Sequence, residues 1–260
     1  MTFSDYQQIK AVNWSTLKEL QRSPLHYRHR LQTPRADSPA MAFGRAVHCA
    51  VLEADRFPEQ FVLWDGGRRA GGDWNEFAAV NASRTILKAD DYRRCLAVRD
   101  AVRGHRAAHR LLRKGKAEQT VTWSDPQTRI RCKARLDWIG PEAAVDLKTT
   151  RDIEQEAFGR VVHNLGYLGQ LGFYDNGLRA NGIRVPWAVI AVEANEPHDV
   201  AVYVVDDETL DYGRDTAWEL LHKLKRTRGR KAQGQYPVPV PLMLPRWAIP
   251  YSDEIEVLDV

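Results

Sequence analysis

The sequence has few cysteines and no pattern that links them. Cys49, Cys95 and Cys132 are far apart and form no CxxC pair. Three thiols are too few for a disulfide scaffold, a four-cysteine zinc site or a four-cysteine iron–sulfur cluster. Such sparse use of cysteine is typical of a reducing compartment, so we expect a cytoplasmic protein without an iron–sulfur cluster.

Long apolar runs are also missing. No stretch approaches the roughly 20 apolar residues that span a bilayer, and the mean hydropathy is −0.49. The opening residues, MTFSDYQQIK, lack the apolar core of a secretory signal. We therefore expect neither a membrane partner nor export by that route.

Internal repeats and low-complexity linkers are absent as well. The 260 residues are 43% apolar and 28% charged, an ordinary composition for a folded chain. We expect a single domain over residues 1–260. Its expected parts are a helical part with a loop (1–115), a catalytic α/β core (116–231) and a proline-rich tail (232–260).

Positive charge is concentrated in two segments, although the net charge is only +4. Residues 93–116 and 223–231 are both rich in arginine and lysine. Two basic segments of this kind indicate a polyanionic partner such as nucleic acid. Solvated helix faces remain the alternative interpretation.

The first half of the chain reads as helical. A helix over 15–22 with Ser15 as its N-cap, a helix over 42–54 and helical structure over 76–113 are predicted. The glycine-rich segment 65–73 between them is predicted to be a flexible loop.

The second half alternates strands with helices. Apolar and polar residues alternate from Glu118 to Trp123 and again over 130–138, and shorter strands are predicted at 143–148, 187–192 and 200–205. Helices are predicted over 153–178 and 208–231. The order β-β-β-α-β-β-α favours an α/β fold with a central mixed sheet flanked by helices.

Two carboxylates and a lysine stand at the ends of neighbouring predicted strands. A turn separates Asp137 from Asp146, so a hairpin would bring them together, and Lys148 shares a strand face with Asp146. Carboxylate oxygens are the ligands that Mg²⁺ prefers, and a bound metal activates water for phosphodiester hydrolysis. Asp-x-Lys is also common on exposed strands, but here it lies between the apolar residues Val145 and Leu147.

Other candidates surround this motif in the sequence. Glu118 begins a strand that could reach the same sheet edge, and His48 lies within a predicted apolar helix, where a core histidine is the alternative. Gln170 and Tyr174 are four residues apart and therefore share one helix face, where an ordinary surface pair is the alternative.

Taken in order, these residues resemble the PD-(D/E)XK nuclease superfamily. The segments FGRAVHCAVLE, GKAEQTVTW, CKARLDW, VDLKTT and GYLGQLGFYDNG are most similar to the exonuclease VIII (RecE-type) nuclease domain of phage and prophage recombination systems. The resemblance covers about residues 13–205 and includes the metal-ligating histidine of the RecB-like branch. It departs from the superfamily name in lacking the proline.

The resemblance implies a role for each residue. Asp137, Asp146, His48 and the Leu147 carbonyl would bind the metal, and Glu118 would bind a second metal or hold a water. Lys148 would act on the attacking water, and Gln170 and Tyr174 would orient the catalytic groups. Mg²⁺ is the expected cofactor, with Mn²⁺ as a substitute.

The implied reaction is Mg²⁺-dependent exonuclease digestion of linear duplex DNA, 5′ to 3′, leaving 3′ overhangs for single-strand annealing. A homo-oligomeric ring around DNA ends and a single-strand annealing recombinase partner are expected with it. Arg22, Arg28, Arg68 and Arg69 are candidate DNA contacts. A PD-(D/E)XK endonuclease or nickase, or a non-catalytic DNA-binding subunit, remain the alternatives.

Overall fold

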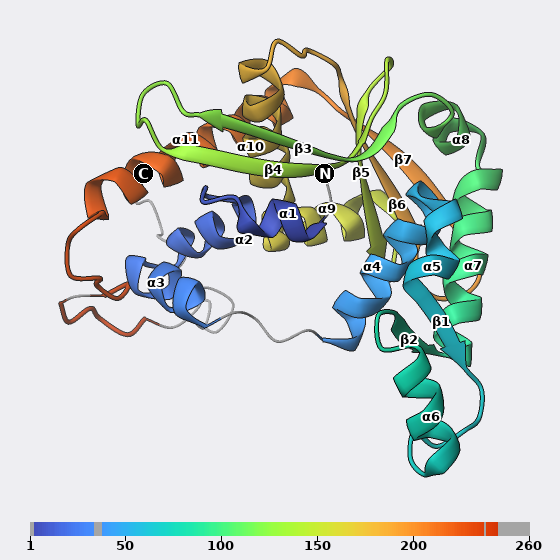
Figure 1. The fold of residues 1–260 in the computed structure, drawn as a ribbon. Helices are drawn as coiled ribbons and strands as arrows, with labels where there is room; N and C mark the ends of the chain where they lie inside the picture. The colour runs from blue at the N-terminus through green and yellow to red at the C-terminus, as the bar shows by residue number, and fades with distance from the viewer. Residues whose placement is uncertain (1–2, 34–37, 237, 244–260) are drawn as a thin grey trace, which may run out of the picture.

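A five-stranded mixed sheet forms the centre of the protein (Figure 1). This computed structural model describes residues 3–33, 38–236 and 238–243. The strands lie in chain order: β3 (Lys116–Ser124), β4 (Arg131–Ile139), β5 (Ala144–Thr150), β6 (Trp187–Glu193) and β7 (Val200–Val205). β5 and β6 are parallel, whereas the other pairs are antiparallel. The predicted α/β fold class is confirmed, and most of the proline-rich tail lies outside the described residues.

Helices cover both faces of this sheet (Figure 1). One hydrophobic cluster joins α4 (Pro39–Leu52) and α7 (Ala89–Gly104) to the sheet through Val145 and Leu147 of β5. A second cluster joins α10 (Tyr167–Ala180) and α11 (Asp207–Thr227) to the opposite face, which Ala144 contacts. Alternate residues of one strand therefore supply two separate cores.

The helices α10 and α11 approach each other closely through glycine. A Cβ atom added to Gly172 would lie 2.0 Å from the carbonyl carbon of Gly213. No side chain fits in that space, so the two backbones set the distance between the helices.

The N-terminal residues lie along β4. The helix α1 (Phe3–Gln8) is followed by a parallel bridge between Val12 and Cys132. The Lys133 ammonium donates hydrogen bonds to the carbonyls of Tyr6 and Ile9 at 2.8 and 2.9 Å. Because these carbonyls end a helix, they carry the partial negative charge that a cation stabilises.

The predicted N-cap at Ser15 is wrong. Asn13 caps α2 (Trp14–Leu17) by accepting from the Thr16 amide at 3.0 Å, and Ser15 only donates to that same Asn13 oxygen. The short helices η1 (Lys18–Gln21) and α3 (Pro24–Gln32) follow. Pro24 begins α3, where a proline costs no hydrogen bond.

The first half of the chain is not entirely helical. β1 (Phe61–Trp64) and β2 (Thr85–Lys88) form a two-stranded parallel sheet, so the helical prediction is wrong at 85–88. Strands of four residues are too short to show a reliable period. The remaining elements here are η2 (Ala54–Arg56), α5 (Phe57–Gln60), α6 (Gly72–Val80) and α8 (Arg106–Leu112).

The predicted helix over 153–178 is two helices. Gly166, with φ at 68°, separates α9 (Gln155–Leu165) from α10. A left-handed residue ends an α-helix, and glycine adopts that conformation without strain. Among the helices of the described residues, none combines the length and apolar character needed to cross a membrane.

Candidate metal centre

Strands β3 and β4 both change faces at the pair formed by Glu118 and Asp137. Val121 of β3 and Leu136 of β4 face the α10 side of the sheet, whereas their neighbours Ala117 and Trp138 face the α4 side. The ladder of paired residues runs from Ala117–Trp138 to Gln119–Leu136 and skips the position between them. The two acidic residues lie opposite each other at this irregular position.

Glu118 is held in a strained conformation. Its φ of 54° is in the left-handed region, which a glutamate rarely adopts within a strand. Two carboxylates placed opposite each other also repel. Arg135 offsets part of this repulsion, because its Nε atom lies 2.6 Å from Glu118 Oε2. Strain and like charge at one position are typical of a functional site rather than of a structural one.

Asp137 lies where β4 and β5 separate. The paired residues are Trp138 with Val145 and Ile139 with Ala144, and the next pair in this register is Asp137 with Asp146. At that point the ladder is replaced by a side-chain bond, in which the Leu147 amide donates to Asp137 Oδ2 at 2.8 Å.

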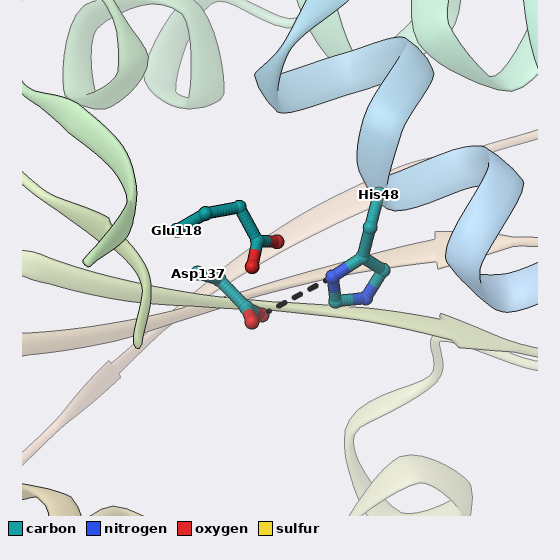
Figure 2. Close-up of side chains that lie close together, drawn as sticks. All are labelled: His48, Glu118 and Asp137. Carbon is teal, nitrogen blue, oxygen red and sulfur yellow. Dashed lines mark ion pairs between the residues drawn. The ribbon is translucent and has the colours of Figure 1, made fainter. Parts of the chain in front are cut away.

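His48 reaches this position from α4 (Figure 2). Its Nδ1 atom lies 3.6 Å from Asp137 Oδ2. One donor atom each from His48, Glu118 and Asp137 lie within 4.8 Å of one another, so the three side chains converge on one point. Burial and the nearby Lys148 lower the pKa of His48, and a hydrogen bond with the Leu147 backbone offsets a small part of that lowering. Since the ring must donate such a bond, its acceptor is the Leu147 carbonyl.

Asp146 and Lys148 lie beside this cluster on β5. The Asp146 side chain is 2% exposed, and its Oδ2 atom lies 2.5 Å from the Lys148 ammonium. Gln170 of α10 donates to Asp146 Oδ1 at 3.3 Å and hydrogen-bonds Tyr174. The Tyr167 ring lies 4.7 Å from the Lys148 ammonium, as a cation–π contact.

Burial and mutual repulsion set the protonation of the cluster. Burial, with Asp146 next in importance, raises the pKa of Asp137 to about 7. Burial and the neighbouring Asp137 likewise raise the pKa of Glu118. Burial and the cation of Lys148 lower the pKa of His48, so its ring is neutral and has a lone pair for a metal. Burial alone would lower the pKa of Lys148, but the two aspartates outweigh it and keep the lysine charged.

The donor set fits a divalent cation. A neutral imidazole, two carboxylates and a nearby carbonyl supply nitrogen and oxygen ligands. A cation would also relieve the repulsion that raises the pKa values of Asp137 and Glu118.

The four arginines named as DNA contacts come from two segments of the chain, η1–α3 and the loop between β1 and α6. Arg22 ends η1 with an exposed side chain, and Arg28 of α3 donates to the Arg230 carbonyl at 2.8 Å. Arg68 and Arg69 lie in the loop between β1 and α6. Arg69 donates to the Ile86 carbonyl at 2.8 Å and lies over the Trp74 ring.

Sequence reasoning missed three residues at this site. Arg135 neutralises Glu118, Tyr167 covers Lys148, and Tyr6 of α1 contributes a phenol whose pKa burial raises to about 12. Arg135 could have been found, because it is two residues from Asp137 and therefore on the same face of a regular strand. Nothing in the sequence links Tyr6 to a strand that begins so much later.

Comparisons with known proteins identify the family of the chain. Residues 13–236 match the family described as PDDEXK-like domain of unknown function (DUF3799). The chain belongs to this family. The comparison of this PDDEXK-like domain with curated proteins gave no match.

One of two similar solved structures shares its fold. A protein from Eubacterium rectale, described as a "Putative exonuclease", superposes with a TM-score of 0.63 at 15% identity, over 94% of this chain and 96% of that one. A second structure, described as SSO0001, has a TM-score of 0.40 at 12% identity and covers 83% of this chain and 81% of that one. The TM-score of the second structure is too low to support an argument. The first structure, at 15% identity, shows a shared fold alone.

Proposed function

We propose that this PDDEXK-like domain is a divalent-metal-dependent nuclease that hydrolyses DNA. The observation that carries the proposal is the convergence of His48, Glu118 and Asp137 on one point, with Lys148 and Asp146 beside it. A fold has no structural need to oppose two acidic residues in a strained strand pair. Phosphodiester hydrolysis is so slow without a catalyst that it requires this kind of charge concentration.

The residues divide the work in a definite way. Mg²⁺, or Mn²⁺ as a substitute, would be held by His48, Asp137, Glu118 and the Leu147 carbonyl. Asp146 would supply a further carboxylate to the metal. When bound, the metal supplies charge neutralisation at the phosphate and lowers the pKa of water. Lys148 is held as a cation by Asp146, so its part is to stabilise negative charge on the attacking water or the phosphate.

Gln170 and Tyr174 position these groups. The Gln170 amide donates to Asp146, and this bond ties α10 to β5. Gln170 also hydrogen-bonds the Tyr174 hydroxyl on the same helix. The two residues therefore fix the Asp146 carboxylate that holds Lys148. The Tyr167 ring contacts the same lysine through its cation–π interaction.

We further propose an exonuclease of the exonuclease VIII type, acting 5′ to 3′ on linear duplex ends. The ordered motifs support this proposal, as does the description of the solved structure from Eubacterium rectale as a "Putative exonuclease". The reaction would leave 3′ overhangs for a single-strand annealing recombinase. A homo-oligomeric ring would keep the enzyme on its substrate, and Arg22, Arg28, Arg68 and Arg69 are its proposed DNA contacts.

End-labelled linear duplex DNA tests the proposal directly. We expect Mg²⁺-dependent release of the 5′ label, no release in EDTA, and an intact covalently closed circle in the same tube. A cut circle would replace the exonuclease with an endonuclease or nickase. Binding without any cleavage would favour the non-catalytic subunit.

Two variants locate the activity. Lys148→Met removes the cation beside Asp146 and should abolish cleavage while DNA binding persists. Glu219→Gln removes an exposed acidic group on α11 and should cleave like the parent protein. Equal loss in both variants would show that the assay reports general damage rather than the site.

A further inference from the structure

A basic cavity lies at the far end of β4 from the metal cluster. Its volume is about 500 Å³, and it is bounded by α3, the end of α11 and the residues that precede α2. Tyr27 and Ile130 contribute apolar surface to its wall. Its cations come from four separate segments of the chain: Lys10, Arg28, Arg131, Arg228 and Arg230.

Among the described residues, these cations have no acidic counterpart in the cavity wall. None of the described residues that line the cavity is an aspartate or glutamate. Within the described part of the chain, Lys10, Arg131 and Arg228 form no ion pair, and Arg28 donates only to the Arg230 carbonyl. Uncompensated like charges repel one another, so their grouping around one cavity indicates an anionic ligand.

The strand β4 connects this cavity to the metal cluster. Arg131 is the first residue of β4 and lines the cavity, and Asp137 lies six residues further along the same strand. At about 3.3 Å per residue, the two positions are roughly 20 Å apart. Figure 1 shows β4 running from the end of α11 toward β5.

We propose that this cavity binds the phosphate backbone of the substrate DNA at a distance from the bond that is cut. The inference rests on the proposed function for the identity of the ligand. B-form DNA rises about 3.4 Å per base pair, so roughly 20 Å corresponds to about six base pairs. Duplex that extends beyond about six base pairs from the cut reaches the cavity, and shorter duplex does not.

Binding to hairpin DNA in EDTA tests the cavity without any need for cleavage. A stem of about 20 base pairs reaches the cavity and a stem of about five does not. In the double variant Arg131→Gln/Arg228→Gln, we expect Kd for the long stem to rise about eightfold for each lost contact at 0.1 M salt. The slope of log Kd against log salt concentration for the long stem should fall by about 0.9 per lost contact. Kd for the short stem should not change.

Two further variants serve as controls. Arg131→Lys/Arg228→Lys keeps both charges and should restore most of the affinity for the long stem. Arg184→Gln removes an exposed arginine in the loop between α10 and β6, away from the cavity, and should bind both stems like the parent. If the double glutamine variant unfolds, Arg228→Gln alone, at the exposed end of α11, gives the same test.

The outcomes separate the cavity from the catalytic proposal. Equal weakening of both stems, or no weakening of either, would overturn the role of the cavity. Loss of affinity confined to the long stem, in a protein that cleaves neither stem in Mg²⁺, would support the cavity and overturn the nuclease. Cleavage in Mg²⁺ together with unchanged affinity in the double variant would support the nuclease and overturn the role of the cavity.

Discussion

Replacing Asp146 by asparagine removes one charge from the centre of the site and keeps the side-chain volume. The carboxylate is 2% exposed and the Lys148 side chain is 12% exposed, so the ion pair is largely withdrawn from water. Removing one partner of a buried pair costs about 3–5 kcal/mol, because the other charge remains buried. Asp137 and the Tyr167 ring stay near Lys148, so we expect the lower end, about 3 kcal/mol.

The matched variant is Asp146→Asn/Lys148→Met. It removes both charges, and replacement of a buried pair by uncharged groups is often close to neutral. We therefore expect its free energy of unfolding to return to within about 1 kcal/mol of the parent. Neither variant should cleave DNA, because the proposed reaction uses both the acidic group and the cation.

Urea denaturation of the metal-free proteins gives the stabilities, and digestion of linear duplex in Mg²⁺ gives the activities. If Asp146→Asn is as stable as the parent, the ion pair does not have the assigned strength. If the double variant is active, the charges serve the fold and the catalytic assignment is wrong. Stability that recovers without activity is the one pattern that supports both.

Four further predictions concern pH, metal binding and packing. Because the pKa of Asp137 is raised to about 7, Mg²⁺ must displace a proton from this carboxyl group below that pH. The Mg²⁺ affinity measured by calorimetry should therefore rise about tenfold per pH unit up to about pH 7. Because that folded pKa exceeds the ordinary value of 3.8, the metal-free protein should lose stability relative to Asp137→Asn as pH rises from about 4 to about 7; identical pH profiles of thermal unfolding would refute this. Mg²⁺ or Mn²⁺ at a hundred times its Kd should stabilise the parent by about 2.7 kcal/mol and stabilise Asp137→Asn far less. Gly172→Ala should lower the free energy of unfolding by about 1–3 kcal/mol in urea denaturation, because its Cβ meets the Gly213 backbone. Gly159→Ala, with open space on α9, should instead stabilise the protein by about 0.5–1 kcal/mol. Equal effects of the two substitutions would show that backbone approach does not set the helix spacing.

The central sheet could be predicted from the sequence because its strands obey simple rules. β4 alternates apolar and charged residues, and β6 is a short apolar run buried on both faces. These patterns follow from the period of a strand and from burial, which are local properties. A hairpin between them was enough to predict that Asp137 and Asp146 lie near each other, although the β4–β5 ladder ends one position earlier, at Trp138 and Val145.

The remaining features depend on contacts between distant segments. The strands β3 and β4 change faces at Glu118 and Asp137, where Glu118 has a positive φ. No sequence pattern at that position indicates a positive φ. β1 and β2 pair in parallel across a helix and are too short to stand out. Asn13 replaces Ser15 as the cap because an asparagine two residues earlier competes for the same helix start.

The bridge between Val12 and Cys132 has a consequence for the order in which the protein is made. Val12 contacts a strand that is synthesised about 120 residues later, so its segment cannot settle until β4 exists. The groups that would bind metal and phosphate likewise wait for β5, because His48 precedes Lys148 by a hundred residues. A nascent chain therefore has no complete site, and the proposed cleavage of DNA would require the finished core.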